Sequence, residues 1–300
     1  MWFILSLVAI LFWSGSDLFS KIGSRPDDKY SHWKLVMAVG LVMGIHAIVQ
    51  LAAGVEFSFQ HIIIYLPVSL LYIVSMIFGY VGLRYIELSI SSPVCNSSGA
   101  LVVIMCYFIL KQPITVMQLI AVILICGGVL GLSIVEKKES DAARMARREE
   151  LDVKYTSSIL AIVFPILYCV LDALGTFADS CWLEYYIEET QANMAYEFTF
   201  LFMGIVGFIY VVLVKKQPII VHREGSKMLA AVCETAGQFA YIFALGANAI
   251  LAAPVITSYC VFSVLWSRLF LKEKLSRKHY AVIFLVLVGI ILLGIFGEGD

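Results

Sequence analysis

Three acidic side chains lie inside long runs of apolar residues, at Asp17, Asp172 and Glu234. An ionisable group in the hydrocarbon of a bilayer costs about 2.5–3.5 kcal/mol by insertion scales, so each acid needs a partner or a function. Asp172 has no Lys or Arg near it in the sequence, and removal from water favours its protonated form. We interpret Asp172 as a candidate proton-binding residue. The alternative is a neutral acid hydrogen-bonded to a facing helix at Asn96 or Tyr168.

The other two acids have polar neighbours at helical spacing. Asp17 precedes Lys21 by four residues, which predicts either an ion pair at the membrane boundary or a cation- or proton-binding site. Glu234 is followed at one-turn spacing by Gln238 and Tyr241. These three side chains share a helix face, where they could bind a solute amine or hydroxyl or could clasp a neighbouring helix.

Polar residues and a proline also recur in two apolar segments, 88–110 and 250–271. We predict that the polar residues line a solute path; they are Ser92, Asn96, Ser97, Thr257 and Ser258. Pro93 and Pro254 each remove one helical hydrogen bond and allow a kink, so we interpret them as hinges. The alternative is that proline is simply common in membrane helices.

The elements that must hold these residues are membrane-spanning helices. Of the 300 residues, 61% are hydrophobic and 14% are charged, which excludes a soluble globule. A bilayer core needs about 20 apolar residues per helix, and we count ten such runs. They are predicted at 2–22, 32–53, 61–83, 88–110, 114–134, 157–180, 196–214, 228–245, 250–271 and 279–296.

The chain contains a duplicated pattern. At an offset of 161 residues, Tyr80 matches Tyr241 and the Pro93-Val94 pair matches Pro254-Val255. This predicts a first five-helix repeat at 1–135, a charged linker at 136–156 and a second five-helix repeat at 157–300. Five spans per repeat are an odd number, so the second repeat would be inverted in the membrane, as in secondary transporters.

Basic residues gather on one side of the predicted membrane. The links between spans 1–2, 3–4, 5–6, 7–8 and 9–10, here called the basic side, receive 20 of the 21 Lys and Arg residues. The opposite, terminal side holds both termini, and its one basic residue is Lys111. The positive-inside rule therefore predicts a plasma-membrane protein with both termini outside the cytoplasm. Acidic residues assigned to the terminal side include Glu56, Asp179, Glu184, Glu188, Glu189 and Glu197.

Small residues, cysteines and a histidine have simpler interpretations. Gly40-x-x-x-Gly44 and Gly127-x-x-x-Gly131 predict close helix crossings. The seven cysteines are an odd number without a C-x-x-C motif, so we expect neither a disulfide nor a metal site. His46 and Gln50, one turn apart, are interpreted as packing partners more readily than as a proton relay.

The whole chain resembles the drug/metabolite transporter superfamily, specifically its EamA-like branch. The turns at 110–115 (LKQPIT) and 271–276 (LKEKLS) are similar to that branch's L-x-E-x-L-T hinge, and Phe12-Trp13-Ser14-Gly15 is similar to its first-helix W-G signature. The resemblance implies a ten-helix basket with a central cavity lined mainly by spans 1, 3, 4, 6, 8 and 9. It implies cytoplasmic termini, opposite to the charge distribution. Related small multidrug resistance proteins carry a working acid in the first helix, and this similarity is the basis for interpreting Asp17 as a cation- or proton-binding site beside the alternative of an ion pair.

We therefore predict an all-α membrane protein that carries a small organic solute by alternating access, coupled to protons, with lipid around it. The solute is a metabolite, an amino-acid-like or a drug-like molecule, and the surplus of acids favours one that bears an amine. No GK dipeptide, H-E-x-x-H or G-x-S-x-G occurs, so we expect no enzyme, no cofactor and no nucleic-acid partner. Two alternatives are a non-transporting subunit or sensor, and an intramembrane aspartyl protease that pairs Asp17 with Asp172.

Overall fold

The computed structural model describes residues 1–24, 28–82, 88–147, 159–272 and 275–297. Within these ranges the elements are helices and no strand occurs. The first half contains α1 (Trp2–Gly23), α2 (Ser31–Ala52), α3 (Gln60–Gly82), α4 (Leu88–Cys95), α5 (Ser98–Phe108) and α6 (Val116–Arg147). The second half contains α8 (Ile159–Tyr185), α9 (Glu189–Phe208), π-helix η1 (Ile209–Val214), 3₁₀-helix η2 (Val221–Arg223), α10 (Gly225–Ala247), α11 (Ala249–Thr257), α12 (Tyr259–Phe270) and α13 (Arg277–Phe296).

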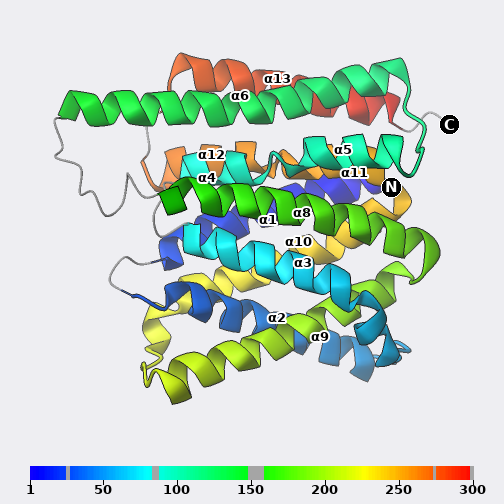
Figure 1. Ribbon diagram of the computed structural model, residues 1–300, viewed down its shortest axis with the longest axis vertical. Coiled ribbons are helices and arrows are strands. Elements are labelled where there is room, and N and C mark those ends of the chain that lie inside the picture. The colour runs from blue at the N-terminus through cyan, green and yellow to red at the C-terminus, as the bar shows by residue number, and fades with distance from the viewer. Residues whose placement is uncertain (25–27, 83–87, 148–158, 273–274, 298–300) are drawn as a thin grey trace.

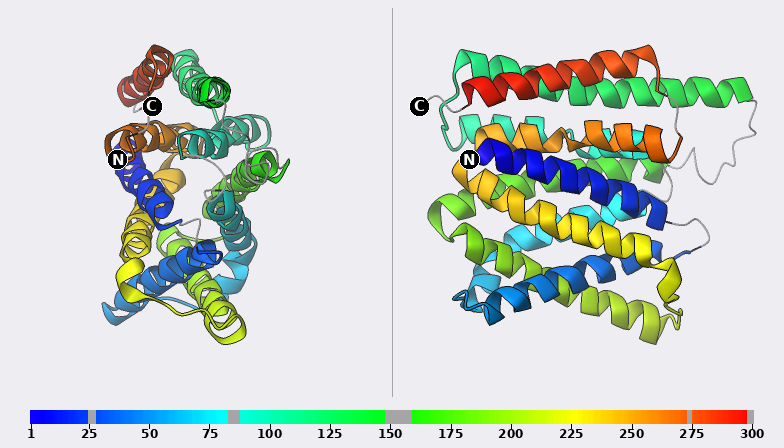
Figure 2. Two further views of the ribbon diagram at one scale, coloured as in Figure 1. Left: turned by 90° about the vertical axis from the view of Figure 1, so that its left-hand side faces the viewer. Right: turned by 180° about the vertical axis from the view of Figure 1, so that it is seen from behind.

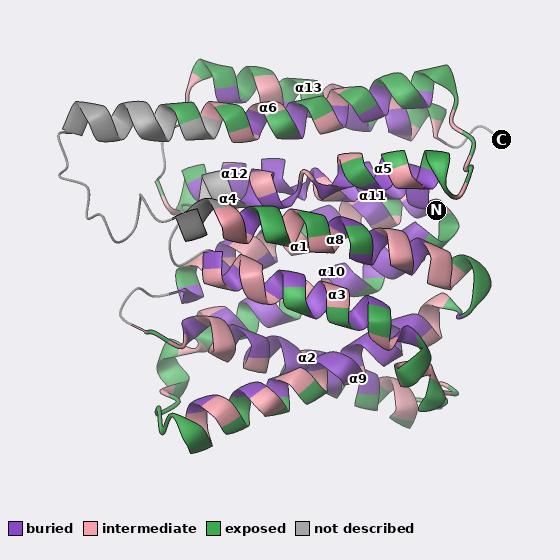
Figure 3. Ribbon diagram, in the orientation of Figure 1, coloured by how far each residue is buried: buried purple, intermediate pink, exposed green. Residues whose placement is uncertain are grey.

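The predicted all-α membrane architecture is confirmed for the part of the chain that the structure describes. Nine helical stretches there are long and apolar enough to cross a bilayer, and a tenth, shorter apolar stretch covers Ser92–Phe108. This tenth stretch corresponds to the predicted fourth span, which is divided into α4 and α5. The outward faces of the bundle are exposed while the inward faces are buried (Figure 3). Many exposed side chains are large and apolar, as a lipid-facing surface requires.

The helices form a bundle of tiers. Helices α6 and α13 pair along one edge, α2 and α9 cross at the opposite edge, and the remaining helices lie between these pairs (Figures 1 and 2). The N-terminus and the end of α13 lie at the same end of the bundle (Figure 1). This end is the terminal side defined above.

Glycines allow the closest helix contacts. A Cβ added to Gly40 of α2 would lie 2.5 Å from the Phe200 carbonyl oxygen and 2.9 Å from the Gly204 Cα of α9. Gly44 lies against Leu201, so residue numbers decrease along α9 as they increase along α2. The two helices are therefore antiparallel. The predicted crossing at Gly40-x-x-x-Gly44 is therefore present between α2 and α9.

The second predicted glycine pair is only partly correct. A Cβ on Gly127 would meet no atom within 4 Å, whereas one on Gly128 would lie 2.3 Å from a Val286 methyl carbon. Because the stretch of α6 from Val116 to Val135 is apolar on nearly every side, its sequence does not reveal which face turns toward α13. The contacts of Gly128 with Val286, and of Ile125 with Gly289, also make α6 and α13 antiparallel.

The two halves have matching landmarks. Helices α4 and α11 start at Leu88 and Ala249, and α6 and α13 start at Val116 and Arg277. Both pairs keep the offset of 161 residues. Lys111 and Lys272, at the same offset, have positive φ angles of 55° and 59°, a conformation that few residues with a side chain adopt. These backbone landmarks therefore recur at the offset of the duplicated sequence pattern.

One predicted boundary is wrong, and one segment has a conformation that was not predicted. The apolar stretch of α6 ends at Val135, close to the predicted end of the fifth span, but the helix continues into the charged segment 136–156 as far as Arg147; positions 148–156 lie outside the described residues. Helix α9 begins at Glu189, seven residues before the predicted seventh span. Glu189 is the first residue of the helix, where its negative charge interacts favourably with the positive end of the helix dipole.

Candidate functional site

A cavity of about 80 Å³ lies between the two halves of the bundle. Its walls come mainly from α1, α3, α4, α8, α10, α11 and the start of α12, and Tyr196 of α9 adds one side chain. Apart from α9, which is the predicted seventh span, these elements correspond to spans 1, 3, 4, 6, 8 and 9, the set that the family resemblance implies. Helices α6 and α13 contribute no described lining residue and pack outside it.

The three acids singled out in the sequence all line this cavity. Asp17 comes from α1, Asp172 from α8 and Glu234 from α10. No Lys, Arg or His is among the described residues that line it. The site therefore collects negative charge without a compensating side-chain cation, an arrangement that suits a cationic ligand or protons.

Each carboxylate accepts a hydrogen bond from a hydroxyl on another helix. Asp17 Oδ2 accepts from Ser92 Oγ of α4 at 2.5 Å and from Ser263 Oγ of α12 at 2.7 Å. Asp172 Oδ2 accepts from Ser98 Oγ of α5 at 2.7 Å, so its partner on the facing helix is neither Asn96 nor Tyr168.

The third carboxylate follows the same pattern. Glu234 Oε2 accepts from Ser16 Oγ of α1 at 2.6 Å, which joins the first helix to α10. Gln238 and Tyr241 lie on the same face of α10 and also line the cavity. One neutral donor orients a carboxylate but leaves it with further acceptor capacity, which a bound ammonium group could use.

Aromatic rings make up much of the remaining wall. They belong to Trp13, Tyr72, Tyr80, Tyr168, Tyr196, Tyr241 and Tyr259. Trp13 packs on Gly237 and Tyr168 packs on Gly79, so each half sets an aromatic ring against a glycine of the other half. The faces of such rings attract organic cations, and this adds to the attraction of the carboxylates.

The polar residues predicted along the solute path divide into two groups. Ser92, Asn96 and Thr257 line the cavity. Ser97 and Ser258 are not among its lining residues, and their hydroxyls donate to the carbonyl oxygens of Pro93 and Val255.

Ser97 and Ser258 lie at two helix breaks. Helix α4 ends at Cys95 and α11 ends at Thr257, so Ser97 and Ser258 occupy equivalent breaks between consecutive helices. There each serine satisfies a backbone carbonyl. The predicted hinge residues Pro93 and Pro254 lie inside α4 and α11, one turn before these breaks.

Sequence reasoning missed a fourth buried acid next to the cavity. Asp179, expected on the terminal-side surface, is 0% exposed. Its Oδ1 accepts from Tyr65 Oη at 2.5 Å and its Oδ2 accepts from Tyr72 Oη at 3.2 Å. Tyr72 Oη also lies 2.5 Å from Tyr241 Oη. These residues, here called the tyrosine network, join α3, α8 and α10.

A helical pattern could have revealed Asp179. Asp172, Thr176 and Asp179 follow one another at spacings of four and three residues, which places them on one face of α8. The predicted span ends at residue 180, and this end places Asp179 among the terminal-side acids. Helix α8 instead continues to Tyr185.

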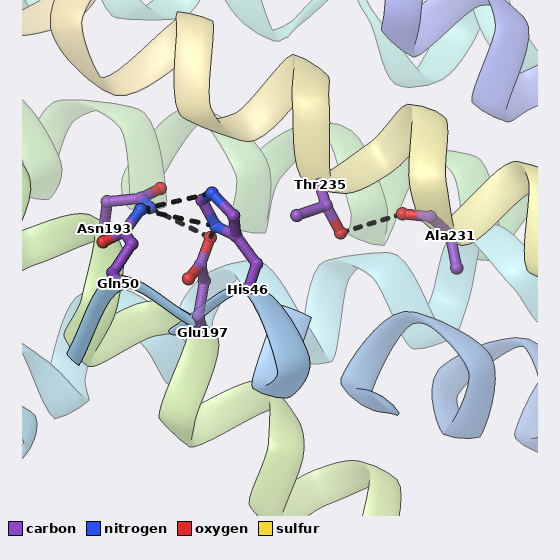
Figure 4. A network of polar contacts seen from close by, with 6 residues as sticks. All are labelled: His46, Gln50, Asn193, Glu197, Ala231 and Thr235. Atoms are coloured by element: carbon purple, nitrogen blue, oxygen red, sulfur yellow. Dashed lines mark hydrogen bonds and ion pairs between the residues drawn. The ribbon is translucent and has the colours of Figure 1, made fainter. Parts of the chain in front are cut away.

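A second polar cluster lies away from the cavity, between α2 and α9 (Figure 4). His46 Nδ1 lies 2.6 Å from Glu197 Oε1, and Asn193 Nδ2 donates to the same oxygen at 2.9 Å. Gln50 Nε2 lies 3.2 Å from His46 Nε2. Glu197 is therefore a buried partner of His46 and not a terminal-side surface acid, and His46 does more than pack against Gln50.

The fold and the cavity together define a class: a multi-pass membrane protein with an acidic cavity between two halves, the architecture of small-solute transporters. The sequence model of the EamA-like transporter family matches residues 1–134 and 183–295. The chain therefore belongs to the EamA-like transporter family, within the drug/metabolite transporter superfamily.

Comparison with solved structures agrees with this fold, since 28 chains match. One crystal structure, described only as that of a protein, aligns with a TM-score of 0.65 and 15% sequence identity. The alignment covers 98% of this chain and 96% of the other. No curated protein matches the sequence.

Proposed function

We propose that this protein is a secondary transporter that carries a small amine-bearing organic solute across the plasma membrane by alternating access, coupled to protons. The observation that supports it best is the acidic cavity of a transporter-family chain. Asp17, Asp172 and Glu234 face one space among aromatic rings, with no basic side chain among the described lining residues. A cationic amine neutralises such a site, whereas an anionic solute would be repelled.

Alternating access requires two related halves, and we propose that 1–135 and 157–300 are inverted repeats. Helix contacts across the bundle support this, because they exchange between the halves. The contact of α1 with α10 has its counterpart in the contact of α8, the equivalent of α1, with α3, the equivalent of α10. In the same way, the contact of α4 with α12 has its counterpart in the contact of α11 with α5. The equivalent helices α2 and α9 are antiparallel, and so are α6 and α13. A two-fold axis in the membrane plane produces this pattern.

We infer that the structure represents a state closed toward the terminal side. The lining residues of α1 run from Trp13 to Ser20, in the half of the helix nearer the basic side, and those of α3 run from Tyr72 to Tyr80. Tyr65 and Asp179 of the tyrosine network lie beyond them, toward the terminal side, while Tyr72 and Tyr241 of the network border the cavity. In this proposal, bending at Pro93 and Pro254 breaks that network and opens the cavity to the terminal side.

Protonation of Asp172 would couple the solute to the proton gradient. The purified protein is reconstituted into vesicles, and uptake from a panel of radiolabelled amines is measured with and without an imposed pH gradient. The variant Asp172→Asn should lose pH-driven uptake while keeping the melting temperature of the parent. The control Glu184→Gln changes an exposed acid of the same helix and should retain uptake. Unchanged pH coupling in Asp172→Asn removes this residue from the mechanism.

A further inference from the structure

Three buried hydrogen-bond donors in the cavity wall have no partner among the described residues. They are Trp13 Nε1, Tyr80 Oη and Gln238 Nε2. The side chains of Tyr80 and Gln238 are almost completely buried, since these residues are 7% and 4% exposed. Buried donors are nearly always paired in folded proteins, so three orphans around one cavity indicate that a ligand atom accepts from them.

The donors lie beside the acids. Trp13 is one turn before Asp17 on α1, and Gln238 is one turn after Glu234 on α10. The Trp13 ring also packs on Gly237, the residue before Gln238, so α1 and α10 bring these two donors to the same region. A ligand whose ammonium group reaches the carboxylates therefore has hydrogen-bond donors within one helical turn of its charged end.

The charge of the cavity decides which acceptor fits. A carboxylate on the solute would satisfy the three donors, but it would lie close to three acidic side chains without a Lys, Arg or His among the described lining residues. A neutral carbonyl oxygen accepts the same hydrogen bonds without this repulsion. The small cavity, about 80 Å³, also favours a compact molecule.

We propose that the cavity selects a primary amine that carries a neutral hydrogen-bond acceptor, such as the carbonyl of an amide, and rejects the free amino acid of the same shape. This inference rests on the proposed amine transport and adds its specificity. Asp17, Asp172 and Glu234 bind the ammonium group. Trp13, Tyr80 and Gln238 donate hydrogen bonds to the neutral acceptor.

Four compounds of nearly equal shape separate the contributions of the two ends. Alaninamide has both groups, 3-methylbutan-2-amine lacks the acceptor, isobutyramide lacks the ammonium group, and alanine replaces the amide by a carboxylate. Binding to the purified protein is measured by calorimetry and by thermal shift, and vesicle uptake is measured in parallel. The corresponding phenylalanine series tests larger solutes. We expect alaninamide to bind roughly tenfold or more tightly than each of the other three.

Two variants test the assignment of the donors. Tyr80→Phe and Gln238→Met should each weaken alaninamide binding by roughly three- to tenfold and leave 3-methylbutan-2-amine unchanged. The exposed Tyr186 provides the matched control, since Tyr186→Phe removes a hydroxyl at the surface.

The possible results separate this inference from the proposed function. Equal binding of alaninamide and 3-methylbutan-2-amine would overturn the inference, because it would mean that water satisfies the donors, and amine transport would stand. Stronger binding of alanine than of alaninamide would also overturn it. If neither cation in either series binds or enters vesicles, the proposed amine transport fails, and the acceptor specificity fails with it.

Discussion

Replacement of Tyr65 by Phe should loosen the terminal-side closure without disturbing the packing. Tyr65 is 0% exposed, and Phe retains its ring, so the change removes only the hydroxyl group that donates to Asp179 at 2.5 Å. Tyr72 Oη donates to the other oxygen of this carboxylate at the longer distance of 3.2 Å, and Tyr241 is a further hydrogen-bond partner. Because Tyr65 belongs to α3 and Asp179 to α8, the lost bond is one that joins the two halves.

The size of the effect follows from the type of hydrogen bond. A bond to a charged group contributes about 1.5–3 kcal/mol and one to a neutral group about 0.5–1.5 kcal/mol. Every 1.4 kcal/mol is a factor of ten in an equilibrium. If the bond exists only in the state closed toward the terminal side, its loss should shift the closed-to-open ratio by about tenfold for a contribution near 1.5 kcal/mol.

A thiol reporter can measure this shift. Val68 of α3 is 0% exposed and lies between Tyr65 and Tyr72 in the sequence, so Val68→Cys places a thiol beside the tyrosine network. Labelling by a membrane-impermeant maleimide is compared with that of the parent protein, which corrects for native cysteines. Adding Tyr65→Phe should raise the labelling rate about tenfold. Tyr186→Phe should not raise it.

The control measurement is the melting temperature of the same variants. A lower melting temperature with an unchanged labelling rate would mean that the bond stabilises the fold in every state. That result would refute the role of the tyrosine network in closing the cavity.

Three further predictions concern packing, pH and orientation. Gly40→Ala should destabilise the protein by about 1–3 kcal/mol, because the new methyl group would overlap a backbone carbonyl of α9, whereas Gly127→Ala should have little effect on thermal stability. Partial burial opposes ionisation of Asp28, but hydrogen bonds led by that from Lys34 Nζ at 2.8 Å lower its pKa. The stabilisation is therefore present above the unfolded pKa, about 3.9, and lost below it, so the difference in melting temperature between the parent and Asp28→Asn should shrink from pH 5 to pH 3. Finally, a membrane-impermeant thiol reagent should label Cys181 on intact cells if the terminal side is outside. Labelling only after the cells are permeabilised would show that the terminal side faces the cytoplasm.

The amino-acid sequence predicts well those features that depend on local pattern. Apolar runs of sufficient length locate the spans, and the offset between Pro93 and Pro254 locates the equivalent broken helices. The three acids in apolar runs were identified because charge in hydrocarbon is costly wherever it occurs. Each of these signals can be read without knowledge of the neighbouring helices.

Features that depend on helix rotation and exact length could not be predicted in this way. Ser97 is polar, like the residues that line the cavity, but at the break after α4 its hydroxyl donates to the carbonyl oxygen of Pro93. Gly127 and Gly128 are equally small, and only the packing of α13 selects the second. The predicted end of the span at 180 places Asp179 near the surface, whereas α8 continues five residues further and Asp179 is buried.

Helix α8 connects the binding and closing functions that we propose. Asp172 faces the cavity, and Asp179 lies two turns further along the same face, about 10 Å away at 1.5 Å per residue. Thr176 lies between them, and its Oγ1 is 3.2 Å from Tyr72 Oη of the tyrosine network. Both acids fall outside the residues that match the family, 1–134 and 183–295. A rigid helix transmits a shift at one acid to the other, so a change at Asp172 on solute binding should alter the closure at Asp179. Tyr65→Phe should therefore weaken the dependence of Val68→Cys labelling on bound solute, and Asp172→Asn should abolish it.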